Sequence, residues 1–129
     1  MRTKLLTLSA LLVGCTAASR PMFAHHGAVA YERKSVTLKG TVTKFEWNNP
    51  HTVLTLVVKD SKGNVEKWIG EASSPNMLVR DGWSRNSLKP GDRISASGHP
   101  ARDGSKIIFL EKLVLPNGRE LAPHPRWPA

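Results

Sequence analysis

An alternating segment at residues 36–47 places the tightest constraint on the fold of this chain. From Val36 to Val42, apolar residues alternate with threonine and lysine, which is the period of a half-buried β-strand. Gly40 interrupts this strand, and the apolar positions change phase between Val42 and Phe45. A glycine inside a strand together with a phase change is typical of a sharp bend, which small barrels require. The sequence therefore predicts a long, bent first strand.

Four further strands and one short helix are expected after this bend. The segments between them are rich in Asn, Asp, Pro and Gly, which favour turns. Ser74 and Pro75 have the residue types of a helix N-cap and a first helical position. The later strands are expected to begin near His51, Val65, Arg93 and Lys106, with the helix between the third and fourth strands.

Five strands with one short helix after the third is the element order of an OB-fold. The predicted fold class is all-β with one short helix, in the form of a five-stranded OB-like barrel over residues 35–121. Residues 122–129 contain three prolines and are expected to form an extended tail. Another small barrel or a β-sandwich is the alternative architecture.

The first 24 residues have the features of a signal peptide. Arg2 and Lys4 give a short positive region, and residues 5–14 form an apolar stretch. That stretch is about half as long as a bilayer-spanning helix requires. We therefore expect residues 1–24 to direct export to the periplasm or the exterior, and residues 25–34 to form an N-terminal segment with a histidine pair.

Three ways of processing this leader fit the sequence. Small residues up to Ala18 form one cleavage site, and Ala24 forms a second, directly before His25. The run that ends at Cys15 resembles a lipobox, and lipidation there would anchor the domain to a membrane. Cys15 is the only cysteine, so the chain forms no intramolecular disulfide and no thiolate metal site.

The histidines near the leader are candidate metal ligands. If cleavage follows Ala24, His25 supplies both an imidazole and a free α-amine, which together chelate Cu(II) or a similar ion. His26 or His51 would complete this site. Copper is the only cofactor that the sequence suggests. The alternative interpretation is a polar N-terminus without a ligand role.

The turn at residues 47–51 is a second candidate site. The loop between the first and second strands is a usual ligand-binding rim in OB-folds, which makes Trp47, Asn49 and His51 candidate ligand-binding residues. We favour the structural interpretation, because Asn and Pro form turns without any function. Three tryptophans are expected to fill the core instead of contacting a ligand: Trp47, Trp68 and Trp83.

The chain is basic, with 19 lysines and arginines against 10 aspartates and glutamates. Without Arg2, Lys4 and Arg20 of the leader, 16 basic residues still face the 10 acidic ones. A basic OB-like face is compatible with single-stranded nucleic acid or another anionic partner, although export argues against nucleic acid. The expected partner is a small ligand or an unidentified envelope protein. A membrane is a partner only if Cys15 is lipidated.

Catalytic motifs are absent from the sequence. It contains no Gly-x-Ser-x-Gly, no phosphate-binding Gly-rich loop with Lys and no His-Glu-x-x-His. We therefore expect a protein without enzymatic activity. A cluster of His51, Glu71 and His26 in a deep pocket would reopen the question.

The sequence contains an ordered set of short motifs: His25–Gly27, Val36–Trp47, Asn49–His51, Ser74–Asn76, Gly82–Trp83 and Ser87–Asp92. Together these motifs resemble those of a family of small exported bacterial proteins of unknown function. The resemblance implies a signal peptide that ends before the histidine pair, which favours cleavage after Ala24, and an exported OB-like domain. It implies no activity. The function expected from the sequence is that of an exported, non-enzymatic binding module.

Overall fold

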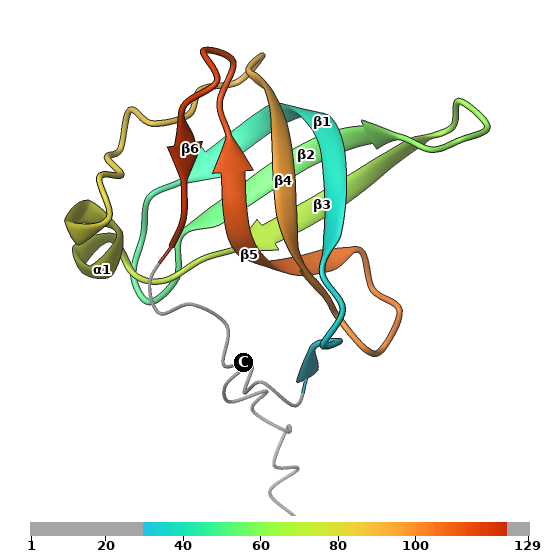
Figure 1. The fold of residues 1–129 in the computed structure, drawn as a ribbon, viewed down its shortest axis with the longest axis horizontal. Coiled ribbons are helices and arrows are strands. Elements are labelled where there is room, and N and C mark those ends of the chain that lie inside the picture. Colours follow the sequence, from blue (N-terminus) through green and yellow to red (C-terminus); the bar gives the residue numbers. More distant parts are fainter. Residues whose placement is uncertain (1–29, 124–129) are drawn as a thin grey trace, which may run out of the picture.

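The computed structural model describes residues 30–123 (Figure 1). The predicted signal peptide, residues 1–24, and residues 124–129 of the predicted tail lie outside this range. The elements in chain order are β1 (Val36–Glu46), β2 (Val53–Lys59), β3 (Val65–Glu71), α1 (Pro75–Arg80), β4 (Arg93–Pro100), β5 (Ile107–Val114) and β6 (Glu120–Leu121).

The strands form a closed barrel. They lie in the order β3-β2-β1-β4-β5-β6, and β3 also pairs with β5, in parallel, from Ile69↔Ile107 to Glu71↔Phe109. This second pairing joins the two sides of the sheet and leaves the five long strands without an open edge. The predicted fold class is confirmed as a five-stranded barrel of mostly strands with one short helix.

The extra strand β6 was not predicted. It contains two residues, Glu120 and Leu121, and pairs with the end of β5 through Leu113↔Leu121. Two residues are too few to show an alternating pattern, so periodicity could not reveal them. Leu121 is buried against the barrel core.

The predicted bend in β1 is confirmed. Its pairing with β2 shifts register between Val42 and Lys44, where the strand bulges. A Cβ atom on Gly40 would lie 2.7 Å from the Val57 carbonyl oxygen, a distance that side-chain carbons do not tolerate. Glycine therefore lets β1 approach β2 closely while it curves over one end of the barrel (Figure 1).

The helix α1 and the segment after it cover one end of the core. Pro75 is at the first position and Ser74 is the N-cap residue, although the Ser74 side chain makes no cap hydrogen bond. Leu78 and Trp83 are buried in the core cluster. In the described part of the chain, no helix is long and apolar enough to cross a membrane.

Two of the three tryptophans expected in the core are only partly buried. Trp83 is 3% exposed, whereas Trp47 and Trp68 pack against the core from its periphery. The core itself consists of side chains that point inward from alternate strand positions, among them Val42, Leu54, Leu56, Ile94, Ile108, Leu110 and Leu113.

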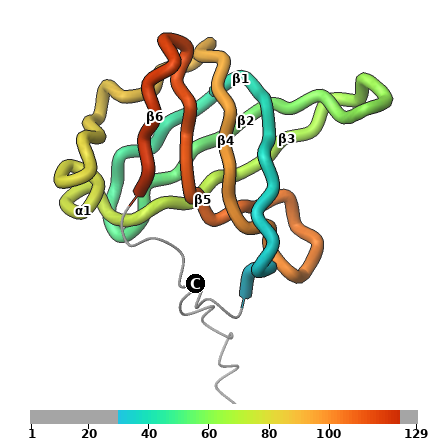
Figure 2. The backbone as a smooth tube through the Cα atoms, in the orientation of Figure 1, coloured from blue at the N-terminus to red at the C-terminus, as the bar shows by residue number. Residues whose placement is uncertain are grey.

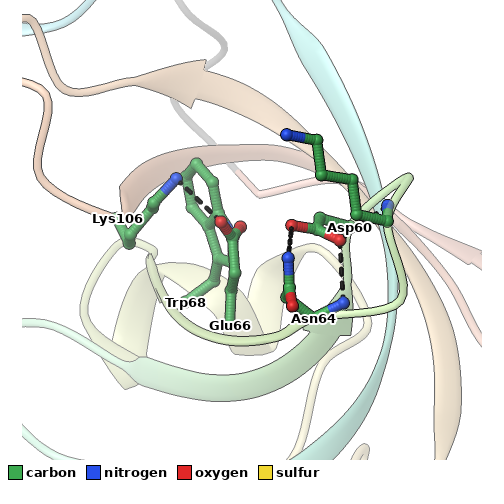
Figure 3. A network of polar contacts seen from close by, with 6 residues as sticks. Asp60, Asn64, Glu66, Trp68 and Lys106 are labelled. Atoms are coloured by element: carbon green, nitrogen blue, oxygen red, sulfur yellow. Dashed lines mark hydrogen bonds and ion pairs between the residues drawn. The ribbon is translucent and has the colours of Figure 1, made fainter.

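The β2–β3 hairpin projects from the barrel (Figure 2). Asp60 holds its turn: its Oδ1 accepts hydrogen bonds from the amides of Lys62 and Asn64, and its Oδ2 accepts one from Asn64 Nδ2 (Figure 3). The side-chain hydrogen bond from Asn64, with the backbone ones, lowers the pKa of Asp60. The carboxylate is thus a fixed part of the turn.

Candidate functional site

His51 is the one predicted metal ligand within the described residues, because His25 and His26 lie outside them. It is exposed and follows a turn with a cis Asn49–Pro50 bond. Its Nδ1 lies 3.2 Å from the carbonyl oxygen of Ala72. A carbonyl oxygen only accepts hydrogen bonds, so Nδ1 carries a proton, and in the neutral ring Nε2 is the nitrogen with the lone pair. Such a backbone contact is common behind metal-binding imidazoles.

No complete metal site forms within residues 30–123. No group of three His, Cys, Asp or Glu side chains there is arranged to hold a metal ion. His51 therefore needs further ligands from outside these residues if it binds one.

The other residues of the predicted rim differ in their surroundings. The Trp47 ring lies 5.9 Å from the Phe45 ring, centroid to centroid, and packs against the core. Asn49 is exposed beside His51. Of the three candidate ligand-binding residues, Asn49 and His51 are therefore open to a ligand, while much of Trp47 is covered.

A buried polar cluster that was not predicted lies where β3, β5 and β4 meet. Tyr31, which is 1% exposed, donates a hydrogen bond from its hydroxyl to Glu71 Oε2 at 3.0 Å. The Tyr31 ring also contacts the ring of Phe109, which is the register partner of both Glu71 and His99. His99 is 4% exposed, and its Nδ1 donates to the carbonyl oxygen of Glu32 at 3.0 Å.

Backbone contacts hold the same segment on the barrel. Arg102 Nε donates to the Tyr31 carbonyl oxygen at 2.9 Å, and the Glu32 amide donates to Pro100 at 2.8 Å. Burial, and secondarily the negative charge of Glu71, raises the pKa of Tyr31, so its hydroxyl remains a donor. We call Tyr31, Glu71, His99 and Arg102 the Tyr31 cluster; its bonds fasten residues 30–32 to the barrel.

Sequence reasoning missed this cluster because its members are far apart in the chain. Tyr31 and Glu71 are separated by 40 positions and His99 and Glu32 by 67. His99 stands directly before a proline, a residue type that favours turns, yet it is a buried residue of β4. The only local indication was a lone tyrosine before the first strand.

Trp68 forms a further polar group with Glu66 and Lys106 (Figure 3). Its Nε1 donates to Glu66 Oε2 at 3.1 Å, and Lys106 Nζ lies 3.2 Å from Glu66 and 5.0 Å from the Trp68 ring centroid. The ring is thus covered by a lysine, which does not favour stacking with a nucleic-acid base.

An open groove of about 640 Å³ lies on the outside of the barrel, beside the bend of β1. It collects three basic residues, two hydroxyl residues, a glycine and several apolar residues from four neighbouring segments. They are Lys39, Gly40, Thr41, Val57, Lys59, Arg93, Ile94, Ser95, Val114, Leu115 and Pro116. We call this the basic groove; the sequence did not indicate it, because its charges come from three different strands.

Comparison with known proteins identifies one family model that matches residues 12–109, more than half of the chain. Its description is "Family of unknown function (DUF6152)". No curated protein matches the chain. The resemblance to a family of unknown function, drawn from the motifs, is confirmed.

Proposed function

The chain belongs to the DUF6152 family of unknown function, and from that premise we propose that it is an exported, non-enzymatic module that binds a copper-type metal ion. The ligands would be the α-amine and imidazole of His25 together with His26 or His51. The observation that carries this proposal is the orientation of His51. Its Nδ1 is fixed on the Ala72 carbonyl and its ring is exposed, so Nε2 is the nitrogen left to bind a metal ion when the ring is neutral.

The expected cleavage of the leader bears on the same proposal. Cleavage after Ala24 would create the free amine that, with the His25 imidazole, makes a chelate for Cu(II). Intact-mass spectrometry of the protein purified from its native envelope tests this step. A mass that begins at His25 supports the site, whereas a mass that begins at Ser19 or retains a lipidated Cys15 removes the free amine from His25.

Calorimetric titration of Cu(II) into the processed protein tests metal binding itself. Changes in the outer shell of a metal site already cost about 10- to 100-fold in affinity, so His25→Ala and His51→Ala should each weaken binding at least that much. His124→Ala is the matched control, because His124 belongs to the tail and has no role in the proposed site. Equal affinities in all variants would refute the proposal.

The second function considered from the sequence was binding of single-stranded nucleic acid. Such binding uses aromatic side chains on which bases stack. The basic groove has no aromatic residue among its lining side chains, and Lys106 covers the ring of Trp68. We therefore favour the metal-binding module; a gel shift with single-stranded DNA at low salt would reverse this preference.

A further inference from the structure

The basic groove brings three positively charged side chains together on neighbouring strands. Gly40 on β1 pairs with Val58 on β2, so the adjacent Lys39 and Lys59 lie at the same end of this strand pair. On the other side of β1, Arg93 of β4 is the register partner of Thr41. Like charges on neighbouring strands destabilise a sheet, so this arrangement is not explained by folding.

These three cations have no carboxylate partner within the described residues. The ion pairs of residues 30–123 that involve lysine use Lys44, Lys89, Lys106 and Lys112. No aspartate or glutamate lines the groove. Asp60, next to Lys59, is occupied by the amides of its own turn. The positive charge of the groove is therefore available to an anion from solution.

The groove is also partly apolar. Val57 of β2 and Val114 at the end of β5 contribute to its wall, together with Leu115 and Pro116, which follow β5. Its volume of about 640 Å³ is within the range of about 300–1,000 Å³ of small-molecule sites. A ligand that satisfies both features has a compact anionic head and an apolar body.

We propose that the basic groove binds a small amphipathic phosphate, a phosphomonoester joined to an alkyl body. Two lysines and an arginine favour a doubly charged oxyanion over a singly charged carboxylate, and the arginine can donate two parallel hydrogen bonds to it. Thr41 and Ser95 supply hydroxyl groups between the cations. This site uses none of the residues of the proposed metal site, so the two proposals stand or fall separately.

Calorimetric titration with octyl phosphate, below the concentration at which it forms micelles, tests the site. Hydrogen bonds to charged groups contribute about 1.5–3 kcal/mol, so Arg93→Gln and Lys39→Gln should each weaken binding by about tenfold or more. Arg85→Gln is the matched control: Arg85 is exposed, lies outside the groove, and its replacement removes the same charge. Absence of binding, or equal weakening by Arg85→Gln, overturns the proposal.

Two related probes separate the contributions of head and body. Inorganic phosphate and octyl glucoside should both bind at least about tenfold more weakly than octyl phosphate, because each lacks one of the two features. If inorganic phosphate binds as tightly as octyl phosphate, the apolar wall has no role and the proposal fails.

Co-sedimentation with phosphatidylcholine vesicles, with and without phosphatidic acid, distinguishes a membrane lipid from a soluble ligand. Sedimentation of the protein that needs both phosphatidic acid and Arg93 assigns the ligand to a membrane lipid. Binding of octyl phosphate without sedimentation assigns it to a soluble phosphate ester.

Discussion

The Tyr31 cluster and the basic groove lie at opposite ends of the same two strands. His99 and Phe109 are at the end of β4 and the start of β5, whereas Arg93 and Val114 are at the start of β4 and the end of β5. In Figure 1 the blue start of the described chain, before β1, lies at the end of the barrel opposite the β5–β6 turn. The same two strands thus carry the Tyr31 cluster at one end and the basic groove at the other.

The difference between the two ends concerns burial and pairing. In the Tyr31 cluster, the buried side chains of Tyr31 and His99 bond to partly buried or exposed neighbours: the Tyr31 hydroxyl to Glu71, the Tyr31 carbonyl to Arg102, and His99 to the Glu32 carbonyl. In the basic groove, like charges are exposed beside an apolar wall. Satisfied buried networks stabilise a fold, whereas unbalanced exposed charge attracts a ligand. We infer that the first end is structural and the second is a binding surface.

Tyr31→Ala should have the largest effect and should affect stability alone. Removing a buried aromatic side chain costs about 3–5 kcal/mol, and the variant also loses the hydrogen bond to Glu71. Urea unfolding measures the loss. Octyl phosphate affinity of the folded variant should equal that of the wild type; a parallel loss of affinity would show that the two ends are not independent.

Glu71→Gln should have a smaller effect of the same kind. The amide oxygen still accepts from Tyr31, but a neutral acceptor contributes about 1 kcal/mol less than a charged one. Glu120→Gln is the control, because its pair with Lys112 is exposed and such pairs contribute about 0–1 kcal/mol. If both substitutions lower the free energy of unfolding equally, the contact between Tyr31 and Glu71 stabilises the fold no more than an exposed ion pair does.

Lys59→Gln should stabilise the protein, whereas Tyr31→Ala and Glu71→Gln destabilise it. Removing one of two like charges at the end of β1 and β2 should raise the free energy of unfolding by about 0.2–1 kcal/mol, while octyl phosphate binding weakens. Urea unfolding at low salt, where charge repulsion is least screened, detects the gain. Lys62→Gln, at the exposed hairpin turn, should leave both quantities unchanged, and a loss of stability in Lys59→Gln would contradict the account of the groove.

The last prediction concerns the titration of Tyr31, the only tyrosine of the chain. Its pKa is raised in the folded state above the ordinary value of 10.0. The stabilisation is therefore fully present below pH 10 and is lost as the pH rises above it. Melting temperatures of the wild type and Tyr31→Phe should run parallel below pH 10, and the wild type should fall more steeply above it. Parallel curves throughout would exclude this contribution.

Local chemistry predicted much of the barrel. The bend at Gly40, the hairpin at Asp60 and the helix start at Ser74 and Pro75 each depend on residues that are neighbours in the sequence. The pairing of β3 with β5 and the short β6 depend on contacts that no local pattern records. The sequence therefore indicated the five long strands and the helix, but neither the short strand β6 nor how the barrel closes.

The candidate sites likewise divide into those that depend on sequence neighbours and those that depend on long-range strand pairing. The exposure of His51 fits its place after an Asn-Asn-Pro turn, which the sequence indicated. The basic groove requires the side-by-side placement of β2, β1 and β4, which brings Lys59, Lys39 and Arg93 together. The Tyr31 cluster requires the closure of β3 on β5. Neither grouping is visible before the strand order is known.

One NMR titration tests the contrast between the two ends most directly. Octyl phosphate is added to ¹⁵N-labelled protein while the amide signals of both regions are followed. The account predicts saturable shifts at Lys39, Thr41 and Ser95, with Tyr31 and His99 unchanged. Shifts centred on Tyr31 and His99, or no saturable shift around the bend of β1, would contradict it.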